Sequence, residues 1–179
     1  MKTLYLERSV STGRGGNWVE ELDLDGVDRI VVGTGPGSFA GIRSAIAFAQ
    51  GYALGRPCEV LGLPSPCAVA AQIKLKGRLA VIGDARCGKL WVALFDGSSL
   101  VCDVFQVNSS EILGSVPNGF SIVTVDEARI GEKLKAAFGE RYLGGQTPTA
   151  EGLKAFAEAN PSVLKPEPLP IYLNPAVRG

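Results

Sequence analysis

The chain has 179 residues, of which 46% are hydrophobic and 20% charged, and its 18 Lys and Arg equal its 18 Asp and Glu in number. This length fits one compact domain, divided at most into two lobes. The even charge gives no support to a nucleic acid held by this chain alone. The absence of histidine removes the commonest general base and the usual Ser/His and Cys/His nucleophile pairs.

The four cysteines, Cys58, Cys67, Cys87 and Cys102, lie far apart and form no C-x-x-C pair. We therefore expect them to pack as small hydrophobic residues rather than to bind a metal. The opening MKTLYLERS lacks the apolar region of a signal peptide, and no apolar run reaches the roughly 18 residues that span a bilayer. The sequence thus predicts a cytoplasmic protein with no membrane contact.

Strands and helices alternate in the first part of the chain. Residues 28–33 read as a buried strand, 40–54 have apolar residues at helical spacing, and 58–63 read as a second strand. Ser65 and Pro66 then fit the N-cap and first position of another helix. This order predicts parallel strands.

Three strands joined by short polar turns are predicted next, at 78–85, 89–96 and 100–107. Residues 96–98, Asp-Gly-Ser, are typical of a hairpin turn. These strands should be antiparallel, so we expect a mixed sheet.

The remaining predicted elements alternate again. They are a short helix at 109–116, a strand at 120–125, amphipathic helices at 127–139 and 149–159, and a proline-rich tail that is extended or ends in an edge strand around 171–173.

A glycine-rich loop, GTGPGSFAGIR at 33–43, joins the first of these strands to its helix. It lacks the lysine and following hydroxyl residue of a Walker A loop. Gly35, Gly37 and Ala40 do satisfy the G-x-G-x-x-A spacing of a dinucleotide site, and Glu59 lies at about the right distance for a ribose. A nucleotide-binding Rossmann-type domain is therefore one candidate.

Two observations argue against that candidate. Pro36 removes a backbone donor from the loop, and no second nucleotide-binding half follows. The glycines also have a simpler interpretation, because they let the chain turn sharply and bring a helix close to a sheet without any ligand.

The loop and its helix resemble a known family. The string VVGTGPGSFAGIRSAIAFAQGYAL, followed by LGLPS, is similar to the signature of the TsaB (YeaZ) family, which usually reads GPGSFTG and then an arginine. In this chain, residues 35–39 read GPGSF, and Ala40 stands where threonine is usual. Gly41 and Arg43 occupy the positions of the signature's glycine and arginine.

Two later segments agree with this resemblance, and the start departs from it. The triplet Asp-Ala-Arg at 84–86 resembles the family's DAR segment, and PIYL at 170–173 resembles its C-terminal ending, with Asn174 in place of arginine. Only about 27 residues precede the strand at 28–33, and the segment YLERSVSTGRGG at 5–16 keeps Ser9, Ser11 and Thr12 but lacks the aspartate of the family's D-T-S-like loop.

The resemblance implies an α/β actin/Hsp70-like ATPase fold of RNase H-like lobes, with mixed sheets flanked by helices and a shortened N-terminal lobe. We expect an N-terminal lobe over 1–88 and a C-terminal lobe over 89–179. It further implies a non-catalytic platform subunit, without a cofactor, for a TsaD-like transferase that transfers threonylcarbamoyl to the adenosine beside the anticodon of tRNA.

A TsaE-like ATPase is a further implied partner, contact with tRNA would be indirect, and a homodimer would form when the transferase is absent. A degenerate homologue that only self-associates is an alternative.

The helix at 40–54 has small residues on two faces, so we expect one face in the core and the other at an interface. A helix buried all round is the alternative. The residues expected at the partner interface are Ile42, Arg43, Ile46, Ala47, Gln50, Gly51 and Leu54. The glycine-loop site comprises Gly35, Pro36, Gly37, Ser38 and Gly41.

Arg43 could meet an anion or a partner's carboxylate, or pair within the domain with Asp84. Asp84 and Arg86 are best explained as a turn with a local ion pair, not as catalytic groups. Trp18 and Trp91 are expected to pack in the core or on a strand face.

Overall fold

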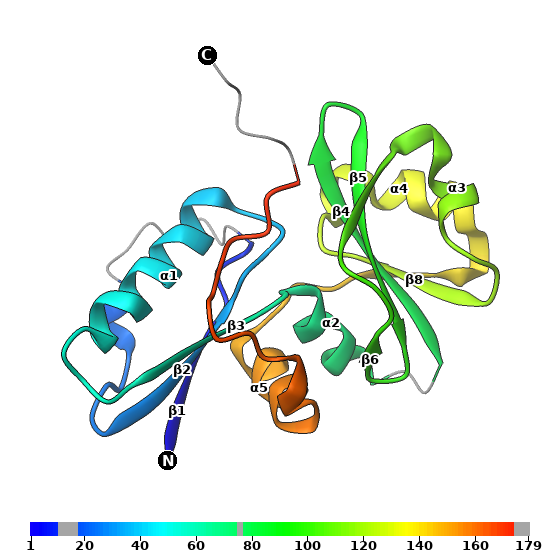
Figure 1. Ribbon diagram of the computed structural model, residues 1–179. Helices are drawn as coiled ribbons and strands as arrows, with labels where there is room; N and C mark the ends of the chain where they lie inside the picture. Colours follow the sequence, from blue (N-terminus) through cyan, green and yellow to red (C-terminus); the bar gives the residue numbers. More distant parts are fainter. Residues whose placement is uncertain (11–17, 75–76, 174–179) are drawn as a thin grey trace.

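The computed structural model describes residues 1–10, 18–74 and 77–173 of the chain. Two β-sheets and their helices form successive layers, as Figure 1 shows. Helix α1 covers the outer face of the first sheet, α2 and α5 lie between the two sheets, and α3 and α4 cover the outer face of the second.

The first sheet is parallel, with the order β1 (Lys2–Leu6), β2 (Val27–Gly33) and β3 (Glu59–Leu63). Only a 3-10 turn, Trp18–Glu21, is assigned between β1 and β2 in the described residues. Helix α1 (Phe39–Ala53) packs its apolar side against this sheet because its buried residues recur at helical spacing. Within the described residues, the first lobe thus comprises these three strands, α1 and the turn at Trp18–Glu21.

The second sheet has the order β6-β5-β4-β8-β9, with β7 also paired to β5. Its strands are β4 (Arg78–Arg86), β5 (Lys89–Asp96), β6 (Ser99–Leu100), β7 (Phe105–Asn108), β8 (Phe120–Thr124) and β9 (Tyr142–Gly145). Strands β4, β8 and β9 are parallel, whereas β5 is antiparallel to β4, β6 and β7. The sheet is mixed, as expected.

Short helical segments cover the outer face of this sheet: a 3-10 turn at Ser109–Glu111, α3 (Ile112–Ser115), α4 (Glu127–Phe138) and a 3-10 turn at Gly139–Arg141. Helix α4 ends at Gly139, where the sequence predicted its stop.

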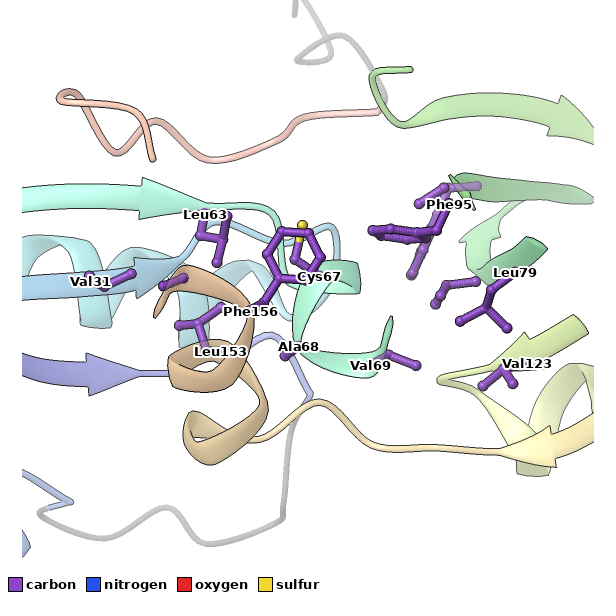
Figure 2. Close-up of a cluster of buried hydrophobic side chains, with 14 of the residues drawn as sticks. Val31, Leu63, Cys67, Ala68, Val69, Leu79, Phe95, Val123, Leu153 and Phe156 are labelled. Carbon is purple, nitrogen blue, oxygen red and sulfur yellow. The ribbon is translucent and has the colours of Figure 1, made fainter. Parts of the chain in front are cut away.

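The largest core lies between the sheets, around α2 (Pro66–Ile73) and α5 (Ala150–Ala159). Figure 2 shows Phe156 of α5 and Phe95 of β5 reaching into this layer, and their ring centroids lie 6.0 Å apart. Gly152 lets α5 approach α2, since a Cβ there would lie 2.6 Å from a backbone oxygen of α2. This core joins the two lobes.

The structure corrects the expected lobe boundary. The sheets separate between β3 and β4, so β4 belongs with the strands that we placed in the second lobe. The strand expected at 100–107 is two short strands, because the chain leaves the sheet at the exposed Cys102 and Asp103.

The last described residues run beside the first sheet, after a 3-10 turn at Pro161–Val163. We call residues 164–173 the strap. Lys165 exchanges two backbone hydrogen bonds with Gly62 of β3, and the Ile171 N–H donates to the Thr34 carbonyl at 2.9 Å. Of the two forms expected for the tail, the structure shows the extended one, and no strand is assigned at 171–173, since proline removes donors along this segment.

Among the described residues, no helix combines the length and apolar character needed to cross a membrane.

Candidate functional site

The glycine loop is bonded to the junction between β3 and α2. The Thr34 N–H donates to the Leu63 carbonyl at 2.9 Å, and the Gly35 N–H donates to the Ser65 hydroxyl at 3.0 Å. The Ser65 N–H in turn donates to the Gly35 carbonyl at 2.9 Å. Ser65 precedes α2 as predicted, but its hydroxyl binds the loop and does not cap the helix.

The loop's glycines allow close packing on the segment that follows β1. A Cβ at Gly37 would lie 2.1 Å from the Ser9 carbonyl oxygen, and one at Gly41 would lie 2.2 Å from the Arg8 carbonyl oxygen. The Ser38 N–H donates to the Ser9 carbonyl. Several of the loop's donors are thus engaged by the protein's own acceptors, an arrangement that does not suit a phosphate cradle.

Glu7 occupies the space beside this loop. Its Oε1 accepts from the Ser9 N–H at 2.7 Å, and its carboxylate covers Gly33, where a Cβ would lie only 2.0 Å from Oε2. Burial raises the pKa of the Glu7 carboxyl. Sequence reasoning missed this residue, although an acid directly after an apolar strand was a signal.

The position of Glu59 argues against a dinucleotide site. Glu59 pairs with Arg29 at 2.7 Å near the start of β3, whereas the loop follows the carboxyl end of β2, where Gly33 pairs with Leu63. A ribose-binding acid needs to lie at the carboxyl end of its strand. The G-x-G-x-x-A spacing is therefore explained by packing.

A cleft of about 620 Å³ lies between the lobes. The glycine loop at 36–39 forms one wall, and the end of β4 at 84–86 with the start of α4 at 125–129 forms the other. Ile171 and Leu173 of the strap also line it.

Asp84 is the most connected acid in this cleft. It lies 3.4 Å from the Arg86 guanidinium and 3.5 Å from that of Arg129, and it accepts from the Arg86 N–H at 2.8 Å. The Asp84 N–H donates to Asp126 at 2.8 Å. The local ion pair expected at this turn is present, and Asp84 does not pair with Arg43.

Glu127 also lines the cleft and accepts a hydrogen bond from the Tyr142 hydroxyl. Burial, reinforced by the Glu127 carboxylate, raises the pKa of Tyr142. Within the described residues, no three His, Cys, Asp or Glu side chains are grouped to hold a metal ion. Trp91, another lining residue, is buried against Gly83 of the neighbouring strand.

The two sides of α1 differ sharply in exposure. Ile42 is 3% exposed and Ile46 is 6% exposed, so both belong to the core and not to the interface where we placed them. The other five expected interface residues are exposed: Arg43, Ala47, Gln50, Gly51 and Leu54. We call these five the α1 outer face. The helix is therefore not buried all round.

Arg43 contacts the strap. Its Nε donates to the Tyr172 hydroxyl at 2.9 Å, and its guanidinium carbon lies 3.9 Å from the centre of the Phe39 ring. Phe39 and Tyr172 are 58% and 54% exposed. We call these three residues the Arg43 cluster.

The chain is similar to one protein family and to solved structures. The model of a family described as TsaD, tRNA N6-adenosine threonylcarbamoyltransferase, matches residues 19–102, a segment that contains β2, α1, β3, α2, β4 and β5. A solved structure titled YeaZ from Pseudomonas aeruginosa is 21% identical, with a TM-score of 0.65, and the match covers 96% of this chain and 99% of that one. The chain has a YeaZ-like fold. This fold agrees with the actin/Hsp70-like, RNase H-like architecture that the resemblance implied.

A second solved structure agrees. It is an uncharacterized protein from Pseudomonas aeruginosa with similarity to peptidase YeaZ, 22% identical, with a TM-score of 0.64, and the match covers 87% of this chain and 78% of that one. The search of curated proteins gives no match.

Proposed function

We propose that this YeaZ-like chain is a non-catalytic platform subunit for a TsaD-like transferase that adds threonylcarbamoyl to the adenosine beside the anticodon of tRNA. The α1 outer face carries the proposal. It follows the GPGSF loop directly, it is exposed, and it lies within the residues that match the TsaD family model.

The shared segment suggests how the two proteins would pair. Because residues 19–102 match the TsaD model, a TsaD-like protein has a counterpart of α1. Two similar helices can pack about an approximate two-fold axis, each using the same side. The small Ala47 and Gly51 would let them approach closely, and nothing lies within 4 Å of a Cβ added at Gly51. The same face would form a homodimer without the transferase.

The state of the cleft supports a non-catalytic role. Asp84 is engaged by two arginines, Asp126 by a backbone N–H, and Glu127 by a tyrosine hydroxyl. The chain has no histidine to act as a base. Chemistry on tRNA would then fall to the transferase, helped by a TsaE-like ATPase, and this chain would touch tRNA only indirectly.

The test is binding of the purified chain to the TsaD-like protein of the same organism, measured by calorimetry and sedimentation. We expect a complex at micromolar concentrations and its loss in Ala47→Glu, which puts a charge into the close contact. Leu113→Glu is the matched control. Leu113 is 56% exposed on the distant α3, so the variant chain should bind the TsaD-like protein normally.

Two results would contradict the proposal. One is no complex with the wild-type chain. The other is tight binding of ATP or NAD by the isolated chain, which would favour a nucleotide-binding enzyme. In a reconstituted reaction of transferase, ATPase and tRNA, omitting this chain should reduce product formation.

A further inference from the structure

The strap meets the first turn of α1 at the Arg43 cluster. The ring centroids of Phe39 and Tyr172 lie 6.0 Å apart, and the Arg43 guanidinium carbon lies 5.6 Å from the Tyr172 ring centre. Phe39 and Arg43 are one helical turn apart, and Tyr172 is 129 positions further along the chain than Arg43. An arginine side chain on an exposed helix usually samples many rotamers, but these contacts restrict this one.

The contacts use only part of the guanidinium. One of its faces lies on Phe39, and Nε donates to Tyr172. In the described part of the chain, no carboxylate lies within 4.0 Å of Arg43. Asp84, the acid that the sequence offered as a partner, is instead bound by Arg86 and Arg129. Among the described residues, no hydrogen bond or ion pair engages the two terminal nitrogens, so they can bind an acceptor that another molecule supplies.

We infer that the Arg43 cluster is a preformed receptor for a carboxylate on the partner's pairing surface, and that Tyr172 extends the α1 outer face onto the strap. A planar guanidinium whose Nε and stacking face are already fixed presents its terminal N–H groups in the fork that matches a carboxylate. The partner is a TsaD-like protein with an Asp or Glu opposite Arg43, so this inference rests on the proposed function.

The anchoring of the strap makes Tyr172 a positioning residue. Ile171 is bonded to Thr34 at the base of the glycine loop, and Lys165 is bonded to Gly62 on β3. Ile171 and Leu173 turn into the cleft. Because side chains alternate along an extended segment, Tyr172 points the opposite way, toward α1. Residues far apart in sequence thus build one surface.

The test measures the dissociation constant of the TsaD-like complex for Arg43→Ala, Arg43→Lys and Tyr172→Phe, at low and high salt. Arg43→Ala should weaken binding about tenfold at low salt, and less at high salt, as expected for a solvent-accessible charge pair. Arg43→Lys should lose nearly as much, since lysine has no fork. Tyr172→Phe keeps the ring but not the hydroxyl, and should weaken binding about threefold.

A double-mutant cycle identifies the acceptor. Acidic residues of the transferase are neutralised one at a time, and among those whose neutralisation weakens binding to the wild-type chain, only one should show no additional loss when combined with Arg43→Ala. Leu113→Ala is the control for the chain, and unchanged melting temperatures would show that the variants are folded.

The outcomes separate the two proposals. All three variants could bind with the wild-type affinity and salt dependence while Ala47→Glu loses binding. This result would overturn the proposal that the Arg43 cluster binds a carboxylate, but not the proposed platform role. An Arg43→Lys variant that binds like the wild type would also overturn it. Absence of any wild-type complex would overturn both.

Discussion

The inner helices α2 and α5 and the outer helix α1 are all rich in small residues, yet they use them differently. In α5, Gly152 faces a backbone oxygen of α2, and Phe156 behind it is 2% exposed. In α1, Gly51 has nothing within 4 Å of an added Cβ, and Leu54 at its end is 83% exposed. Small residues serve folding in the inner pair, whereas those on the outer side of α1 are exposed, as the proposed pairing requires.

The largest effect that tests this contrast is expected at Phe156. Phe156→Ala removes a ring from the layer between the sheets and should destabilise the chain by about 3–5 kcal/mol. Leu54→Ala, a truncation of an exposed apolar side chain at the end of α1, should change the free energy of unfolding by less than about 0.5 kcal/mol. Urea denaturation of both variants measures the difference, and similar losses would refute the contrast.

The next effect is at Gly152. Gly152→Ala places a Cβ 2.6 Å from the Ala68 carbonyl oxygen, so α5 has to move away from α2. We expect a loss of about 1–3 kcal/mol by denaturant unfolding. A neutral or stabilising result would show that the helices are not held at this distance.

Glu7, beneath the loop that leads into α1, should make stability depend on pH. Burial raises the pKa of its carboxyl above the ordinary value of 4.5, so the folded chain binds this proton more tightly than the unfolded chain. The resulting stabilisation is present below about pH 4.5 and is lost as pH rises through the folded pKa. Glu7→Gln should remove this dependence.

Denaturant unfolding of both proteins at several pH values provides the measurement. The advantage of the Gln variant should grow as pH rises and then level off. Parallel pH profiles would contradict the prediction.

The smallest expected effect is at Gly51, where alanine should stabilise the chain, whereas alanine at Gly152 should destabilise it. Gly51→Ala fills open space on α1 and should stabilise the chain by about 0.5–1 kcal/mol, because alanine loses less backbone entropy in a helix. Differential scanning calorimetry should show a higher melting temperature. A decrease would mean that position 51 is already packed within the chain.

Local patterns were enough to predict most of the fold. The strand at 28–33, the helix after it and the stop at Gly139 all agree with the structure, because apolar periodicity and helix-ending residues depend on neighbours in sequence. Strand β9 was missed, since its four residues, YLGG, have neither the length nor the alternation of a typical strand.

The site could be predicted only in part. The motif located the glycine loop, but not the packing of Arg8 and Ser9 onto it, which depends on a contact between the segment after β1 and the loop after β2. Periodicity alone also left open which side of α1 faces the sheet, and so Ile42 and Ile46 were placed at the interface. The contact between Arg43 and Tyr172 spans 129 positions, and no local pattern indicates it.

The bonding of the glycine loop also sets an order of events during synthesis. Thr34 lies in the first fifth of the chain, yet its carbonyl is bonded by Ile171, near the last described residue. A ribosome-bound chain can build the parallel sheet early, but it cannot finish the loop until the strap has left the exit tunnel. If α1 pairs as proposed, the part of the pairing surface that includes Tyr172 would form only after the strap has been synthesised.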